Sequence, residues 1–96
     1  MRRALAAAIG LASIAAAVVA SAEPPAGTAA CSGCHPASTR VTSPVPRLAG
    51  LDRAAIVRAM QDFRSGTRAA TVMDRIAKGF TDTEIQAIAA WYATQR

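Results

Sequence analysis

Two cysteines and the one histidine of this sequence have the types and the spacing to do chemistry together. They stand in the run Cys31-Ser32-Gly33-Cys34-His35. Two thiols separated by two residues can add to the vinyl groups at one edge of a haem, and the adjacent imidazole can then bind the iron. The run therefore predicts one covalent haem, attached through Cys31 and Cys34 and ligated by His35.

Three other uses of these residues compete with haem attachment. A thioredoxin-type redox pair requires a βαβ setting, and the sequence has no strand pattern. A zinc site needs four ligands, whereas the chain has two cysteines and one histidine. A disulfide between Cys31 and Cys34 would close a very short loop and would stabilise little. We therefore favour haem attachment.

An iron that transfers electrons needs a second axial ligand, and a methionine thioether raises its reduction potential. Met60 falls at helical spacing between Ile56 and Phe63, where a methionine is usually a core filler. Met73 follows a segment of small residues and stands 38 residues after His35, enough chain to pass around a porphyrin. The sequence favours Met73 over Met60 as the second iron ligand.

Helices must position these residues, because the apolar periods in the sequence are helical. We expect a short helix over residues 28–35, which carries the cysteines, and a surface loop over residues 36–50, which contains three prolines. Asp52 can cap a longer helix that ends at Gly66. The charged residues expected on the solvent side of that helix are Arg53, Arg58, Asp62 and Arg64.

Two further helices are expected in the last third of the chain. The first covers residues 69–78 and ends at Gly79. The second begins at the capping box Thr81-Asp82-Thr83-Glu84 and runs to Ala93. Its apolar side consists of Ile85, Ile88, Ala89 and Tyr92. The sequence predicts an all-α domain.

Residues 1–22 have the pattern of a secretory signal peptide. Arg2 and Arg3 precede an apolar run over residues 4–20, and Ala20-Ser21-Ala22 is a small-x-small cleavage site. We expect cleavage after Ala22, which leaves residues 23–96 as a periplasmic domain without membrane insertion. A retained anchor is the alternative, because about seventeen apolar residues are near the minimum for spanning a bilayer.

The charge and the aromatic content limit the function classes. Loss of Arg2 and Arg3 lowers the net charge from +5 to +3, and the remaining basic residues form no run. Nucleic-acid binding is therefore not expected. The mature chain is short and has only two Phe, one Trp and one Tyr. A chain of this size needs a staple or a cofactor to complete its core.

From Cys31 to its end, the chain resembles the class I c-type cytochromes. The resemblance rests on the attachment run, on Pro46-x-Leu48-x-Gly50, on the Met73 segment and on the final helix. It implies a small class I cytochrome c fold, with three to four helices around one haem c. It also implies that the Pro46 carbonyl accepts a hydrogen bond from the His35 ring. An aromatic residue of the last helix, Trp91 or Tyr92, would pack against the cysteine-bearing helix.

Within this family, residues 63–79 are most similar to the cytochrome subunit of flavocytochrome c sulfide dehydrogenase. The resemblance implies an electron carrier that is not itself an enzyme. Its redox partner would be a sulfide-oxidising flavoprotein subunit, a respiratory oxidase or another periplasmic carrier. The alternative function is a ligand sensor or small haem enzyme with an open iron position, and Met73 argues against it. Three basic residues surround Met73 and can steer an acidic partner: Arg68, Arg75 and Lys78. The alternative is that they form only a solvated helix face.

Overall fold

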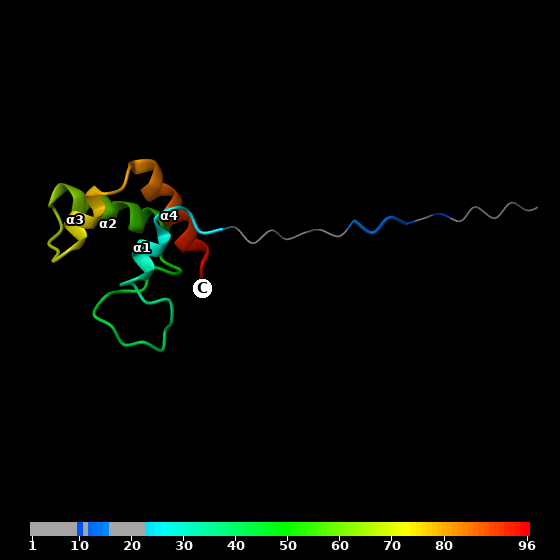
Figure 1. Cartoon of the computed structure of the whole chain (residues 1–96), viewed down its shortest axis with the longest axis horizontal. Helices are drawn as coiled ribbons and strands as arrows, with labels where there is room; N and C mark the ends of the chain where they lie inside the picture. The colour runs from blue at the N-terminus through cyan, green and yellow to red at the C-terminus, as the bar shows by residue number, and fades with distance from the viewer. Residues whose placement is uncertain (1–9, 11, 16–22) are drawn as a thin grey trace, which may run out of the picture.

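The computed structural model describes Gly10, residues 12–15 and residues 23–96. The predicted cleavage after Ala22 and most of the predicted signal peptide lie outside these residues. The described residues form four helices and no strand, which confirms the all-α prediction (Figure 1). The helices are α1 (Thr28–Ser32), α2 (Arg53–Ser65), α3 (Met73–Lys78) and α4 (Asp82–Thr94). None of these helices has the length and apolarity needed to cross a membrane.

The two ends of α2 lie where the sequence predicts them. The Asp52 carboxylate accepts a hydrogen bond from the Ala55 N–H at 3.1 Å, which satisfies one of the free amides of the first turn. Gly66 ends the helix with φ at +80°, a left-handed conformation that glycine adopts without a steric penalty. Both boundary predictions are confirmed.

Two predicted helices are longer than the observed ones. Helix α1 ends at Ser32 instead of residue 35, because Gly33 follows it as the C-cap and glycine is a poor helix former. Helix α3 begins at Met73 instead of residue 69. Residues 69–72 are all exposed, so no packing stabilises a longer helix there.

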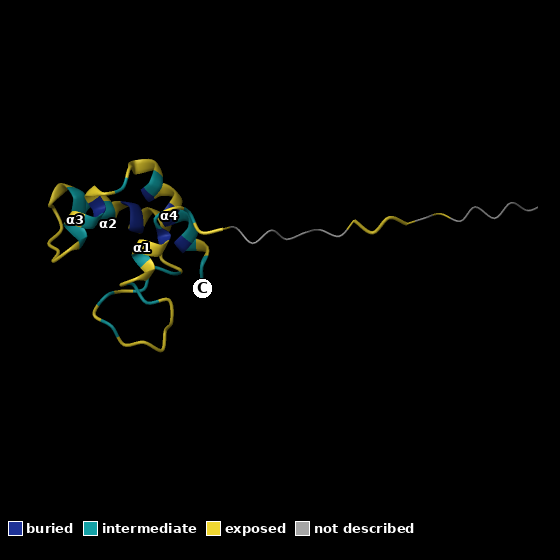
Figure 2. Ribbon diagram, in the orientation of Figure 1, coloured by how far each residue is buried: buried dark blue, intermediate teal, exposed yellow. Residues whose placement is uncertain are grey.

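The core lies between α2 and α4, whose buried faces are dark blue in Figure 2. Its residues are Ile56, Val57, Ile85, Ile88, Ala89 and Tyr92, so the predicted apolar side of the last helix is confirmed. Half-buried Cys31 packs against this cluster and ties α1 to it. Gly27, before α1, has φ at +91°, and a Cβ there would stand 2.5 Å from the Phe80 ring. The approach of α1 to the core therefore requires glycine at position 27.

The prediction that Arg64 faces solvent is wrong. Arg64 is half-buried, and its guanidinium donates to the Asp82 carboxylate at 2.6 Å and to the Phe80 carbonyl at 2.7 Å. These contacts join the end of α2 to the start of α4. The helical period places Arg64 on the outer face of an isolated helix, but it does not predict which segment packs beside that face.

The capping box of α4 gives a testable stability effect. The Thr81 hydroxyl accepts from the Glu84 N–H at 3.2 Å, and the Glu84 carboxylate accepts from the Thr81 N–H at 3.0 Å. We expect Thr81→Ala to lower the free energy of unfolding of the holoprotein by about 1 kcal/mol in a denaturant titration. Thr83→Ala, in the same exposed turn, is the control and should cost less. Equal losses would contradict a capping role for Thr81.

Candidate functional site

A helical turn brings the two thiols and the imidazole into one short segment. The Cys31 carbonyl accepts from the Cys34 N–H at 3.2 Å and from the His35 N–H at 2.9 Å. Both thiols are unpaired, with Cys31 half-buried and Cys34 exposed. Burial raises the pKa of the Cys31 thiol, and a hydrogen bond that the sulfur accepts from the backbone N–H of the same residue opposes that shift. The thiols are therefore free for thioether formation.

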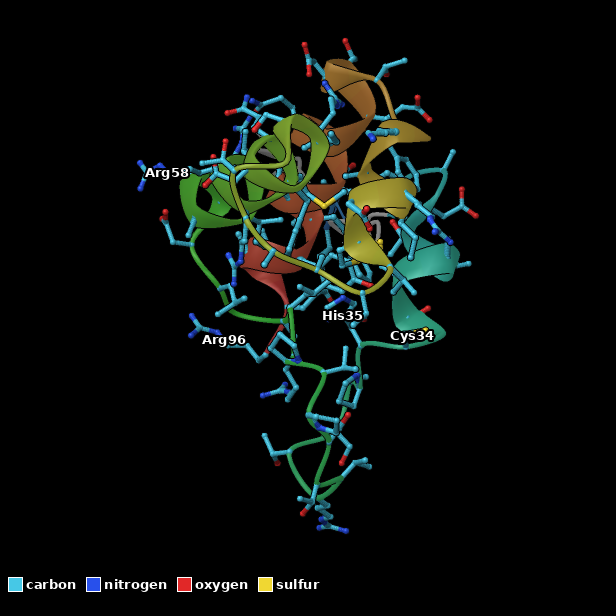
Figure 3. The ribbon with its side chains drawn as sticks, turned by 90° about the vertical axis from the view of Figure 1, so that its left-hand side faces the viewer. Cys34, His35, Arg58 and Arg96 are labelled. Atoms are coloured by element: carbon cyan, nitrogen blue, oxygen red, sulfur yellow. The ribbon has the colours of Figure 1, made fainter. Side chains whose placement is uncertain are left out.

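The His35 ring is oriented by the loop that follows it. Its Nδ1 lies 2.5 Å from the Pro46 carbonyl oxygen. A carbonyl only accepts hydrogen bonds, so this contact requires the ring proton on Nδ1. Nε2 then keeps its lone pair for a metal. Figure 3 shows Cys34 and His35 where α1 meets the loop of residues 36–50.

The two candidate methionines occupy different positions. Met60, in α2, packs against the core cluster between α2 and α4. Met73 is the half-buried first residue of α3 and does not belong to the cluster found among the described residues. Packing therefore accounts for Met60 and leaves Met73 as the candidate for the iron. The assignment of Met73 stays a prediction.

Tyr92 is hydrogen-bonded to the cysteine-bearing helix. Its hydroxyl donates to the Thr28 carbonyl of α1 at 3.4 Å. Trp91 packs edge-on against the Tyr92 ring, with ring centroids 5.0 Å apart. Burial, and to a lesser degree the nearby Cys31, raise the pKa of Tyr92. The phenol therefore stays protonated and keeps donating at neutral pH.

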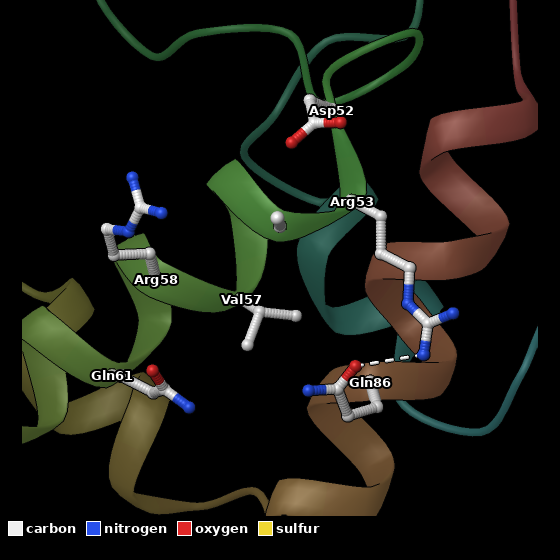
Figure 4. Close-up of a pocket in the computed structure, with 7 residues that line it drawn as sticks. Asp52, Arg53, Val57, Arg58, Gln61 and Gln86 are labelled. Atoms are coloured by element: carbon white, nitrogen blue, oxygen red, sulfur yellow. Dashed lines mark hydrogen bonds between the residues drawn. The ribbon is translucent and has the colours of Figure 1, made fainter.

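Two cavities lie near these elements, and we assign neither to a haem. One, of about 320 Å³, has His35, Trp91 and Tyr92 in its lining but neither thiol nor Met73. The other, of about 400 Å³, is a groove between α2 and α4 in which Arg53 donates to Gln86 at 2.9 Å (Figure 4). No residue of the predicted site lines that groove.

The donor set of residues 31–35 fits a covalently attached haem. Two free thiols one turn apart match two vinyl groups, and a neighbouring imidazole with an open Nε2 matches the iron. The described part of the chain contains no group of three His, Cys, Asp or Glu side chains placed to hold a metal ion without a porphyrin. The two thiols and the imidazole therefore suit haem attachment.

The basic residues around Met73 are all exposed. The Arg68 guanidinium lies over the Phe63 ring, 4.9 Å from its centroid. Arg75 and Lys78 stand in the last turn of α3. The one salt bridge within the described residues joins Arg64 and Asp82, so these three cations have no carboxylate partner there.

The chain matches no protein-family model. It is 40% identical over 62 residues to the cytochrome subunit of sulfide dehydrogenase of Chlorobaculum tepidum, covering 65% of this chain and 56% of that protein. It is 35% identical over 65 residues to cytochrome c-552 of Acidithiobacillus ferridurans, covering 68% of this chain and 28% of that protein. It is 40% identical over 63 residues to a thiosulfate dehydrogenase electron acceptor of Stutzerimonas stutzeri, covering 64% of this chain and 29% of that protein. The chain thus spans little more than half of the first relative and under a third of the others.

Proposed function

Because this chain belongs to the c-type cytochromes, which carry covalent haem c, we propose that it is a periplasmic carrier of single electrons. The haem supplies a reversible one-electron couple at its iron. The orientation of His35 supports the proposal most directly, because the Pro46 carbonyl fixes Nδ1–H and leaves Nε2 for the iron. In this account the mature protein is the domain of residues 23–96, released by cleavage after Ala22.

Each residue of the site has one part in this function. Cys31 and Cys34 hold the haem in place, and His35 ligates the iron from one side. Met73 would be the second ligand and would close the iron to external ligands. With both ligands supplied by side chains, the protein would exchange electrons and would not bind a substrate at the iron.

The absorption spectrum of the mature protein tests this proposal. We expect a low-spin reduced spectrum that does not change when carbon monoxide is added. Ready binding of carbon monoxide would contradict closed His–Met ligation. It would favour the alternative function, a ligand sensor or small haem enzyme with an open iron position.

We propose a sulfur-oxidising dehydrogenase as the redox partner. Two relatives support this choice, since their names are a cytochrome subunit of sulfide dehydrogenase and a thiosulfate dehydrogenase electron acceptor. For this chain, a flavoprotein subunit that oxidises sulfide is the first candidate, and a respiratory oxidase is the second. The exposed Arg68, Arg75 and Lys78 would attract an acidic patch on either partner, mainly by raising the association rate.

Purification from the native host separates a permanent subunit from a diffusing shuttle. A subunit buries a large interface, so it should co-elute with a flavoprotein during size-exclusion chromatography in high salt. A shuttle relies on exposed charges, so its association should weaken as the salt concentration rises. Co-elution with a flavoprotein at high salt supports the sulfide dehydrogenase partner, and elution alone at low and high salt contradicts the subunit form.

A further inference from the structure

We propose that Arg47 is a positioning residue, which holds the Pro46 carbonyl against the imidazole of His35. The half-buried Arg47 donates from Nε to the Ala37 carbonyl at 3.0 Å. The adjacent residue, Pro46, accepts from His35. Residues 35–37 and 46–47 are thus joined by two neighbouring hydrogen bonds, and these bonds close the base of the loop between them. This role rests on the proposed function, because it acts through the ligand of the iron.

The loop beyond this base does little to fix Pro46. Residues 38–45 extend away from the helices as a projecting loop (Figure 1). Hydrogen bonds to the Ser38 and Ser43 hydroxyls come from the N–H groups of Arg40 and Val45, two residues further on. Such bonds stabilise local turns and do not tie the loop to a helix. The position of Pro46 therefore depends on the residues at the base of the loop.

The chain directly after Pro46 is anchored twice, by the packing of Leu48 and by the hydrogen bond of the Arg47 side chain. Leu48 packs against the core cluster, which holds the chain after Pro46. Pro46 has no N–H with which to make a backbone bond of its own. The hydrogen bond from the Arg47 side chain to the Ala37 carbonyl ties the chain next to Pro46 to the segment beside His35.

The link matters for the iron because the hydrogen bond at Nδ1 orients the imidazole and sets its basicity as a ligand. When Arg47 is removed, the Pro46 carbonyl is free to move and the Nδ1–H proton becomes more accessible to water. The positive charge of Arg47 is lost at the same time. A test must therefore separate the hydrogen bond from the charge.

The readout is the exchange of the His35 Nδ1 proton with solvent, followed by NMR in the reduced holoprotein. We expect Arg47→Ala to raise the exchange rate about fivefold, which is the equilibrium factor for one intramolecular hydrogen bond. Arg47→Lys keeps the charge but lacks a donor at the Nε position, so exchange should also be faster. Arg40→Ala is the matched control, since Arg40 is an exposed arginine of the same loop whose contact is made by its backbone N–H.

Unchanged exchange in Arg47→Ala would overturn the proposal. Wild-type protection in Arg47→Lys, or an equal rise in Arg40→Ala, would also overturn it, because charge alone would then explain the effect. Arg47→Lys is the milder change and preserves the test if Arg47→Ala does not fold. Failure of the haem assignment is distinguishable, because the wild-type protein would then show no haem absorption at all.

Discussion

Replacing His35 with alanine is expected to abolish stable holoprotein. The change removes the proposed ligand of the iron, and the haem is expected to complete a core that the chain cannot build alone. The buried hydrophobic residues of the described chain are few and include two alanines: Ile56, Val57, Ala77, Ile85, Ile88, Ala89 and Tyr92. In small domains of this kind, binding free energy is also folding free energy.

The measurement is the yield of low-spin holoprotein from a host that attaches haem to cytochromes c. Ser32→Ala is the matched control, because Ser32 lies within the attachment run and its exposed hydroxyl donates to the Ala29 carbonyl of its own helix. We expect a normal yield from the control and almost none from His35→Ala. Wild-type yield and a low-spin spectrum in His35→Ala would contradict the assignment of His35.

Replacing Met73 with alanine is expected to open the iron to added ligands and to lower its reduction potential, because the thioether stabilises ferrous iron. Met60→Leu is the matched control. It is close in volume and lies in packed surroundings, so it should cost less than about 1.5 kcal/mol of unfolding free energy and leave the spectrum unchanged.

Carbon monoxide binding and the absorption band of the thioether–iron bond measure this contrast. The Met73 variant should lose the band and bind carbon monoxide, while the Met60 variant should do neither. Loss of the band in Met60→Leu together with its retention in Met73→Ala would reverse the assignment of the second ligand.

Local signals in the sequence predicted much of the fold. Asp52, Gly66 and the Thr81–Glu84 capping box act within one turn of their own helix, so the residue types alone are enough to place those ends. The start of α3 was not predicted correctly because it depends on which residues find a packing partner. The apolar period of the sequence is the same whether or not residues 69–72 are helical. It therefore does not show that the helix begins at Met73.

Tertiary contacts explain what the sequence left open or missed. The choice between Trp91 and Tyr92 depends on which ring faces Thr28, and two adjacent helical positions do not settle that alone. Arg64 became a link between helices only because Phe80 and Asp82 pack beside it. Arg47 is the unspecified position between Pro46 and Leu48 in the family pattern, so the pattern does not single it out. The fold of the loop brings it to Ala37.

For the site, the sequence predicts a chemistry but little of the geometry. The spacing of Cys31, Cys34 and His35 is a covalent constraint on haem attachment, so it can be recognised without a structure. The contact between His35 and Pro46 spans eleven residues, and only the family resemblance implied it in advance. The loop between them has no periodic pattern from which to derive its path.

Intact mass spectrometry tests the central claim most directly. The wild-type protein, matured in a host that attaches haem to cytochromes c, should have the mass of residues 23–96 plus one haem, and the haem should survive denaturing extraction. The double variant Cys31→Ala, Cys34→Ala should lack that added mass. A wild-type mass equal to the bare chain, or a double variant that folds with a normal red spectrum, would contradict covalent attachment through these two cysteines.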